Sequence, residues 1–149
     1  MISRKAFLKG ATNAAGAIAL APLATILEAC TPSAQAVRGT VENLRVIIPA
    51  AGLPALALPG GFVKVYVDEL PNPFLLFRSD GEGLIAVLST CSHRGCEVRK
   101  SKTKFECPCH GSEYDLRGNV IKGPASEPLE SFPVAQTKDH LEFPIRKFQ

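Results

Sequence analysis

Six cysteine and histidine residues crowd into the twenty residues from position 91 to position 110. They account for four of the five Cys and two of the three His in the chain. They form two boxes, Cys91-Ser92-His93-Arg94-Gly95-Cys96 and Cys107-Pro108-Cys109-His110-Gly111-Ser112-Glu113-Tyr114-Asp115. Thiolate and imidazole are ligands that suit both zinc and iron–sulfur clusters. The boxes therefore predict a metal or cluster site, and the residue types alone do not choose between the two.

The number of ligands leaves more than one assignment open. Four Cys on a single ion would leave both His unused, whereas a set of two Cys and two His would leave two Cys over. In a protein that leaves the cytoplasm, disulfides persist. The inner residues of the two boxes, Cys96 and Cys109, could then join loop to loop while the remaining residues bind the cofactor.

The rest of the body predicts short β-strands. Four runs of β-branched or aromatic residues, each bounded by Pro, Gly, Asn or Asp, are typical of strands. They cover residues 46–48, 62–67, 74–77 and 84–88. Residues 80–83 predict a hairpin connection between the last two runs, and residues 129–134 and 140–145 are expected to close the domain as a pair. These signals together predict an all-β fold, a small antiparallel β-sandwich.

The apolar runs stop between Leu88 and Leu129. A segment that buries little apolar surface needs a metal or a disulfide to hold it. The cluster region is therefore expected to be a loop insertion in the sandwich.

The first 29 residues have the order of an export signal. A basic stretch at residues 3–9 precedes a run without charge at residues 10–27. The start resembles a bacterial twin-arginine signal, which exports proteins already folded around a cofactor, with Arg4-Lys5 in place of the usual Arg-Arg pair. The expected organisation is a signal or anchor at 1–29, a tether at 30–40 and a domain at 41–149.

Three interpretations compete for the end of this segment. Leu27-Glu28-Ala29-Cys30 resembles a lipoprotein cleavage box, which would make Cys30 the lipidated first residue. Ala34-Gln35-Ala36 would instead supply an ordinary cleavage site. A retained anchor is the third, although residues 11–27 fall short of the roughly 20 apolar residues that span a bilayer. We expect lipidation of Cys30.

Taken together, the two boxes resemble the Rieske family, whose boxes are Cys-x-His-x-Gly-Cys and Cys-x-x-His-Gly-Ser-x-Tyr. Both are present here in full. The resemblance implies a 2Fe-2S cluster in which two Cys bind one iron and two His bind the other. Carried over, Cys91 and Cys107 hold one iron, and His93 and His110 hold the other.

The same resemblance implies further features of the site. Cys96 pairs with Cys109 in a disulfide. Gly123 and Pro124 belong to a segment similar to the proline-containing loop that covers the cluster in this family, so they are expected to be cofactor-binding residues. The cluster-binding part is expected at about residues 89–127.

The disulfide pair is similar to that of high-potential members from quinol-oxidising cytochrome bc-type complexes; soluble ferredoxins and ring-hydroxylating oxygenases generally lack it. In those members, hydroxyls equivalent to Ser112 and Tyr114 donate hydrogen bonds to sulfur, which raises the potential within a span of roughly −150 to +300 mV. The resemblance also implies that His110 is the exposed imidazole that accepts a hydrogen bond from quinol. The implied partners are quinol and b-type and c-type cytochromes. The implied location is the outer face of the bacterial cytoplasmic membrane, through a lipid or an N-terminal anchor.

One residue departs from that pattern. Arg94 stands where cytochrome bc-type members commonly carry Leu, so a freestanding exported carrier, or the small subunit of another periplasmic oxidoreductase, is the alternative. Nucleic acid is not an expected partner, because 17 Lys and Arg against 14 Asp and Glu give no strong basic excess. His140 lies in an expected strand away from both boxes and is not counted as a ligand.

Overall fold

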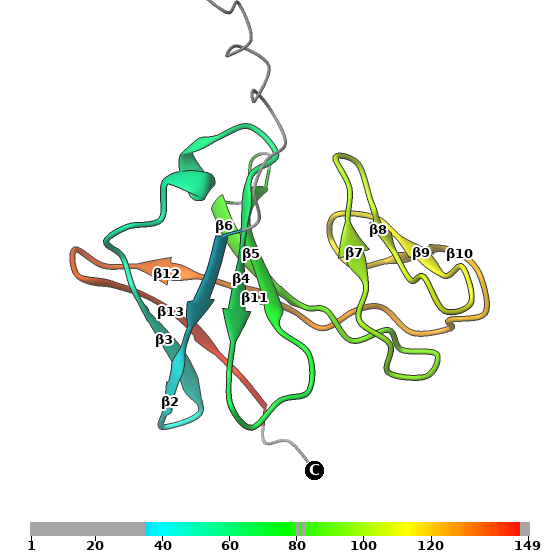
Figure 1. The fold of residues 1–149 in the computed structure, drawn as a ribbon, viewed down its shortest axis with the longest axis horizontal. Coiled ribbons are helices and arrows are strands. Elements are labelled where there is room, and N and C mark those ends of the chain that lie inside the picture. Colours follow the sequence, from blue (N-terminus) through cyan, green and yellow to red (C-terminus); the bar gives the residue numbers. More distant parts are fainter. Residues whose placement is uncertain (1–34, 80, 82, 147–149) are drawn as a thin grey trace, which may run out of the picture. The chain divides into compact units, whose positions relative to one another are not determined.

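A five-stranded sheet forms the centre of the computed structural model, which describes residues 35–79, 81 and 83–146. The sheet has the strand order β1-β4-β5-β6-β11 (Figure 1). Strand β1 runs parallel to β4, and the other neighbours are antiparallel. The strands are β1 (Gln35–Arg38), β4 (Phe62–Tyr66), β5 (Phe74–Ser79), β6 (Gly83–Leu88) and β11 (Ser131–Pro133).

A second sheet of four strands, in the order β12-β13-β3-β2, completes the sandwich. Buried positions alternate along its two central strands, as expected for a sheet with one buried face. The side chains of Val46 and Ile48 in β3, and of Leu141 and Phe143 in β13, are buried in the core between the sheets. The strands are β2 (Thr40–Glu42), β3 (Arg45–Pro49), β12 (Ala135–Gln136) and β13 (His140–Pro144), and one short 3₁₀ helix, η1 (Pro54–Ala57), precedes β4.

The cluster-binding part is inserted between β6 and β11, as the sequence predicted. It carries a small antiparallel sheet in the order β10-β9-β8-β7. These strands are only two or three residues long: β7 (Arg99–Lys100), β8 (Phe105–Glu106), β9 (Glu113–Tyr114) and β10 (Val120–Lys122).

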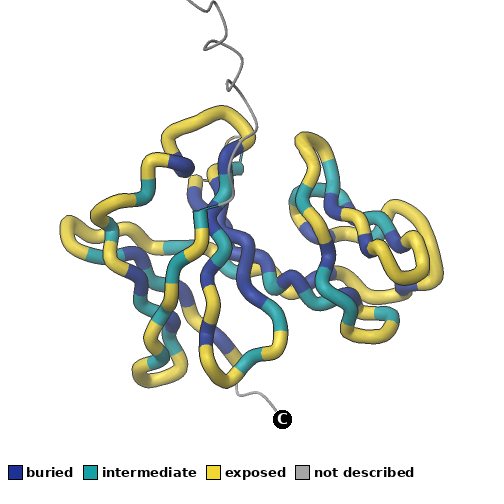
Figure 2. Tube along the Cα trace, viewed as in Figure 1, coloured by how far each residue is buried: buried dark blue, intermediate teal, exposed yellow. Residues whose placement is uncertain are grey.

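The central strands β5 and β6 are buried on both faces (Figure 2). Phe74 and Leu76 face the core shared with the four-stranded sheet, whereas Leu75 and Phe77 face a second core. That second core contains side chains of the cluster-binding part, including Phe105 and Tyr114. Burial of both faces explains why these strands are unbroken apolar runs, and it fixes the cluster-binding part to the sandwich by apolar contact.

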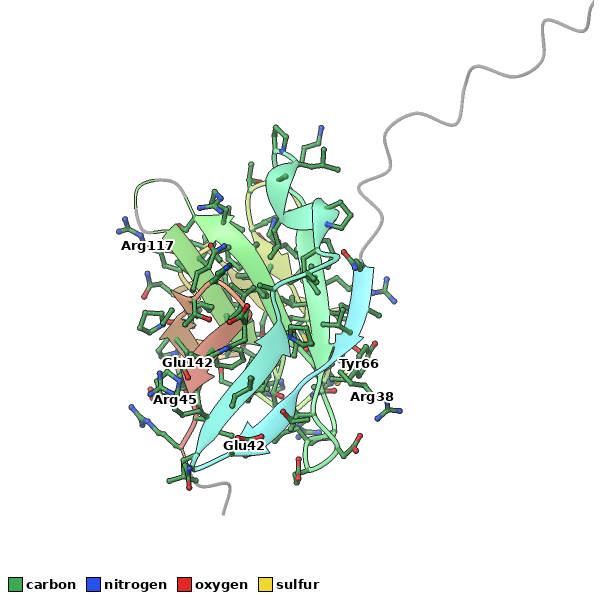
Figure 3. All side chains as sticks on the ribbon, turned by 90° about the vertical axis from the view of Figure 1, so that its left-hand side faces the viewer. Arg38, Glu42, Arg45, Tyr66, Arg117 and Glu142 are labelled. Atoms are coloured by element: carbon green, nitrogen blue, oxygen red, sulfur yellow. A yellow bond between two sulfur atoms is a disulfide. The ribbon has the colours of Figure 1, made fainter. Side chains whose placement is uncertain are left out.

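An ion pair joins two neighbouring strands of the four-stranded sheet on its solvent-facing side. Arg45 in β3 makes a two-pronged contact with Glu142 in β13, at 2.9 and 3.1 Å (Figure 3). The two residues lie near one another because β3 and β13 pair from Arg45–Pro144 to Pro49–His140. Such a bidentate pair favours this register.

The closing pair predicted at residues 129–134 and 140–145 was wrong in its partners. Strand β11 pairs with β6 in the other sheet, and only β12 pairs with β13. The chain passes from one sheet to the other between Pro133 and Ala135, so the last two sheet strands before β13 belong to different layers.

Part of the expected tether at residues 30–40 forms strands in the structure. Residues 35–38 form strand β1, and β2 begins at Thr40. Val37 packs partly buried against the core of the sandwich. The small residues of this interval suit a linker in composition, yet one half-buried Val beside β4 is enough to order a short edge strand.

The predictions on export and lipidation, including that of Cys30, fall outside the described residues. Within the part that the structure describes, no helix has the length and apolar character needed to span a membrane.

Candidate metal centre

The two boxes fold into the same local turn. In the first, the carbonyl of Cys91 accepts the N–H of Gly95 at 2.8 Å; in the second, the carbonyl of Cys107 accepts the N–H of Gly111 at 3.0 Å. In each box the N–H of the same Cys donates to the carbonyl five residues further on, at 2.9 and 2.8 Å. Both turns require positive φ at the Gly, +76° and +74°, a conformation that other residues adopt only with strain. The repeated turn presents one buried thiol from each box.

A disulfide joins the two turns, as the sequence predicted. Cys96 and Cys109 are bonded, with their Cα atoms 6.6 Å apart and a sequence separation of 13. Cys91 and Cys107 are the free cysteines of the described residues, and both are buried, with 2% and 3% of their surface exposed. The structure therefore sorts the four box cysteines into one bonded pair and two inward thiols.

Side chains of the sandwich hold the first box in place. The amide of Asn72 donates to the carbonyl of Gly95 at 2.8 Å and to the hydroxyl of Thr90 at 3.1 Å. Lys64 in β4 forms an ion pair with Glu97 at 2.7 Å. These contacts come from the loop before β5 and from β4, so the turn that carries His93 is anchored to the central sheet.

A group of hydroxyls surrounds the Cys91 thiol. The hydroxyl of Tyr114, which is fully buried, lies 3.2 Å from Cys91 Sγ and 3.1 Å from Ser92 Oγ, and it accepts the backbone N–H of Ser92 at 3.3 Å. Ser112 is also fully buried, and its Oγ accepts the N–H of Ala125 at 3.2 Å. Tyr114 and Ser112 are thus inward hydroxyls within the cluster-binding part, as expected from the second box.

These neighbours change the acidity of the Cys91 thiol. Burial alone raises its pKa. Hydrogen bonds from the Tyr114 hydroxyl, the His93 backbone, the Cys107 side chain and the Ser112 hydroxyl outweigh burial, and the net pKa is lowered. The environment therefore favours the thiolate, which is the form of Cys that binds metal. The pKa of Tyr114 is raised by burial and by Cys91, so its proton stays on the phenol and is available for donation.

A third loop packs against the second box. Gly123 has φ of +105°, and a Cβ built on it would lie 2.5 Å from Ser112 Cα and 2.9 Å from the Gly111 carbonyl. Only a glycine allows this close approach of two backbones. Pro124 follows at the surface, and Ala125 makes the hydrogen bond to Ser112 described above. Gly123 therefore lies against the second box, and the role of this loop as a cover for the cluster stays a prediction.

Two imidazole rings, one from each box, lie against each other. The rings of His93 and His110 have centroids 4.8 Å apart and meet nearly edge to face. His93 Nδ1 is buried and has no hydrogen-bond partner in the protein, whereas His110 is exposed. A buried polar atom without a partner is costly. Two inward thiols and an unpartnered imidazole nitrogen are the donor set that a sulfur- and nitrogen-ligated iron cluster would satisfy.

A second grouping of sulfurs does not make a separate metal site. The Sγ atoms of Cys96, Cys107 and Cys109 all lie within 4.8 Å of one another. Two of these sulfurs are bonded to each other, so Cys107 is the one cysteine of the three with a free thiol.

The sequence matches the family model of the Rieske [2Fe-2S] domain over residues 52–133. This chain belongs to the Rieske family. The match runs from the loop before η1 to the end of β11, so it covers both boxes, the third loop and the five-stranded sheet apart from β1. The cofactor of this Rieske domain is a 2Fe-2S cluster.

The relatives of this Rieske chain include iron-sulfur subunits of cytochrome b6-f complexes. It is 28% identical to the subunit of Chlorobaculum tepidum over 88% of its own length and 69% of that protein. It is 37% identical to subunit 1 of Synechocystis sp. over 63% of its length and 54% of that protein. It is 39% identical to the subunit of Synechococcus elongatus, covering 48% of this chain and 41% of that protein.

Solved structures give the same fold. The cyanobacterial plasma membrane Rieske protein PetC3 from Synechocystis PCC 6803 superposes with a TM-score of 0.54 at 29% identity, over 64% of this Rieske chain and 97% of that one. The quaternary ammonium Rieske monooxygenase CntA, at 20% identity and a TM-score of 0.52, covers 69% of this chain and 33% of its own. The likeness to CntA shows a shared fold alone.

Sequence reasoning missed three contributors to this Rieske site. Asn72 holds the Gly95 turn, Ser92 contacts Tyr114, and the backbone carbonyl of Glu127 accepts the Ser92 hydroxyl at 2.6 Å. Ser92 stands between two expected ligands, and its hydroxyl was a visible signal. Asn72 and the Glu127 carbonyl carry no sequence signal, because their role depends on which loops meet.

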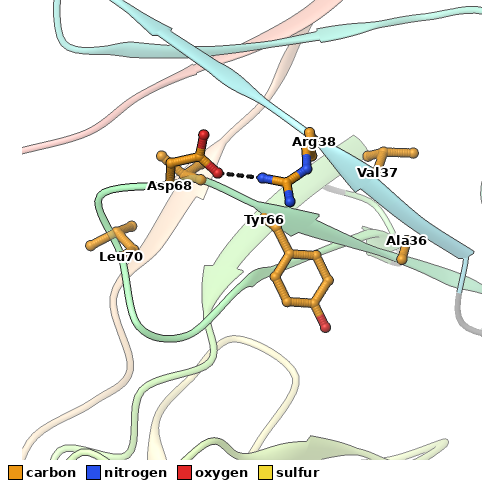
Figure 4. Close-up of a pocket in the computed structure, with 7 residues that line it drawn as sticks. Ala36, Val37, Arg38, Tyr66, Asp68 and Leu70 are labelled. Carbon is orange, nitrogen blue, oxygen red and sulfur yellow. Dashed lines mark hydrogen bonds and ion pairs between the residues drawn. The ribbon is translucent and has the colours of Figure 1, made fainter.

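Another groove in the structure lies apart from the boxes. It has a volume of about 540 Å³ beside β1 and β4, and it contains Tyr66, Leu70 and the ion pair between Arg38 and Asp68 (Figure 4). None of its lining residues is a Cys or a His. Among the described residues, the candidate metal ligands therefore lie in the two boxes and not in this groove.

Proposed function

We propose that Cys91 and Cys107 bind one iron of the 2Fe-2S cluster and that His93 and His110 bind the other. We further propose that the chain accepts electrons from quinol and passes them to a c-type cytochrome, as the iron–sulfur subunit of a membrane complex that also contains a b-type cytochrome. The similarity to cytochrome b6-f iron-sulfur subunits supports this assignment.

The observation that carries the proposal is the contact between the Tyr114 hydroxyl and Cys91 Sγ at 3.2 Å. A hydroxyl aimed at a ligand sulfur stabilises the additional negative charge of a reduced centre, and so raises its potential. The proton stays on Tyr114, because burial and Cys91 raise its pKa. A high potential is the property that an acceptor of electrons from quinol requires.

The cluster, when bound, accepts and releases one electron at a time. The residues of this chain supply the rest. Cys91 and Cys107 are buried and would hold an iron away from water, whereas His110 lies at the surface. The imidazole nitrogen of His110 that is free of iron can accept a hydrogen bond from a quinol hydroxyl and take up its proton. Surface exposure of His110 therefore suits a reaction in which a proton leaves together with an electron, and His110 is the proposed catalytic residue.

Arg94 favours the alternative function. It is exposed, directly follows His93 and forms no ion pair among the described residues. Two of the basic residues that follow it in the sequence are less available, since Lys104 pairs with Glu106 and Glu113, and Lys100 lies 5.0 Å above the Phe77 ring. A free charge beside an expected ligand suits a partner with an acidic surface, as a freestanding exported carrier or another periplasmic oxidoreductase could use.

Purification of the full chain from native membranes separates the two functions. We expect it to co-purify with a b-type cytochrome and to support inhibitor-sensitive oxidation of quinol. Isolation of the chain alone, or with a different redox enzyme, would contradict the quinol assignment and favour the carrier. The same experiment tests the proposed location at the outer face of the cytoplasmic membrane, and mass spectrometry of the purified chain tests lipidation of Cys30.

A further inference from the structure

The hydroxyl of Ser92 has only one proton, and its neighbours determine where that proton goes. Ser92 Oγ lies 2.6 Å from the backbone carbonyl of Glu127. A carbonyl oxygen can only accept a hydrogen bond, so the Ser92 hydroxyl must be the donor in this contact. Toward its other neighbour, the Tyr114 hydroxyl at 3.1 Å, Ser92 Oγ is therefore left as an acceptor.

The Tyr114 proton consequently has two acceptors within reach. One is Cys91 Sγ at 3.2 Å, and the other is Ser92 Oγ at 3.1 Å. The N–H of Ser92 donates to the same Tyr114 oxygen at 3.3 Å, so this oxygen already accepts one hydrogen bond, and it has a single O–H to donate. The single O–H of Tyr114 is shared between these two acceptors. The stronger its hydrogen bond to Ser92 Oγ, the weaker its hydrogen bond to Cys91 Sγ.

Ser92 also connects two loops that come from different parts of the sequence. Its bond to Glu127 ties the first box to the third loop, and the bond from Ala125 to Ser112 ties that loop to the second box. The bond to Glu127 fixes the direction of the Ser92 hydroxyl, because a short contact to a backbone carbonyl leaves little freedom of rotation. The acceptor side of Ser92 is therefore held toward Tyr114.

We propose that Ser92 is a positioning residue that draws the Tyr114 proton partly away from Cys91 Sγ and so sets the reduction potential of the cluster below the value that Tyr114 alone would give. This inference rests on the proposed ligand set and on the proposed role of Tyr114. It assigns a function to the residue between two expected ligands, which the boxes themselves leave unspecified.

The test is a double-variant cycle read by protein-film voltammetry on the cluster-loaded protein. Ser92→Ala removes the competing acceptor but keeps the backbone N–H that anchors Tyr114, so the midpoint potential should rise. The reduction equilibrium should shift by up to about tenfold, which is about 59 mV for one electron. Ser92→Thr keeps a hydroxyl at the same position and should return the potential to that of the unchanged protein.

The second arm of the cycle uses Tyr114→Phe. In that background Ser92→Ala should have no effect on the potential, because there is no phenol proton to redirect. An equal shift in both backgrounds would mean that Ser92 acts only by holding the loop, and it would overturn the proposal, as would an unchanged or lower potential for Ser92→Ala alone. If Tyr114→Phe by itself left the potential unchanged, the role proposed for Tyr114 would fail first, so the two failures are distinguishable.

Discussion

A variant carrying both Cys96→Ser and Cys109→Ser should lose about 2 to 5 kcal/mol of stability, the usual cost of removing a native disulfide from a small exported domain. The bond links two turns that carry one buried thiol each, at a sequence separation of 13. Without it, the unfolded chain gains conformational freedom, and the turns of Cys91 and Cys107 lose the covalent link that joins them directly. The cluster should therefore be lost faster from the variant.

The measurement is the rate at which visible absorbance of the cluster disappears in denaturant, compared between the unchanged protein and the double variant. Treating the unchanged protein with a thiol reductant is the matched control, and it should reproduce the faster loss. Equal rates of cluster loss for all three samples would contradict the prediction that the disulfide slows loss of the cluster. So would a count of reactive thiols showing Cys96 and Cys109 both free in the folded protein.

Removing the hydroxyl of Tyr114 or of Ser112 should lower the reduction potential without preventing assembly of the cluster. Tyr114→Phe and Ser112→Ala each delete one oxygen and leave the proposed ligands unchanged. A hydrogen bond to a charged group contributes roughly 1.5 to 3 kcal/mol, and part of that is gained only on reduction. Since about 59 mV is a tenfold change for one electron, each variant should fall by tens of millivolts up to about a hundred, and the pair by more.

Tyr66→Phe is the matched control for this series. Tyr66 and Tyr114 are the two Tyr of the chain, and Tyr66 is 42% exposed on β4, away from both boxes. Its variant should keep the potential of the unchanged protein. If Tyr114→Phe and Ser112→Ala also kept it, the high-potential assignment would lose its main support, and the freestanding carrier would become the better function.

The sequence predicted strands well where burial produces a strong local pattern. The runs at 74–77 and 84–88 lie in β5 and β6, and the turn between them was placed at the right position. An unbroken apolar run does not reveal that its two faces meet different layers. That Phe74 faces the sandwich core and Leu75 the cluster-binding part depends on contacts far away in sequence.

The failure at β11 and β12 has the same origin. The strands are three and two residues long, and a segment of that length carries too few alternating positions to specify a partner. Leu129 to Val134 therefore looked like one strand beside β13. In the structure, β11 completes the five-stranded sheet on β6, and the chain changes sheet before β12 begins.

In the candidate site, the resemblance of the two boxes to the Rieske family predicted the disulfide between Cys96 and Cys109, and the structure contains it. The same resemblance singled out Tyr114 as a hydroxyl donor to sulfur, and that role stays a prediction. The partners of Ser92 could not be predicted, because one is a backbone carbonyl in a third loop. A carbonyl has no side-chain identity, so only the fold shows which one a hydroxyl will meet.

Mössbauer spectroscopy of the reduced, ⁵⁷Fe-labelled protein tests the proposed ligand set most directly. Two thiolates on one iron and two neutral imidazoles on the other make the irons chemically different. We expect two iron sites in equal amounts, a ferric site with the parameters of thiolate ligation by Cys91 and Cys107, and a ferrous site with those of nitrogen ligation by His93 and His110. Two irons with the same all-sulfur ligation would contradict the proposed ligand set.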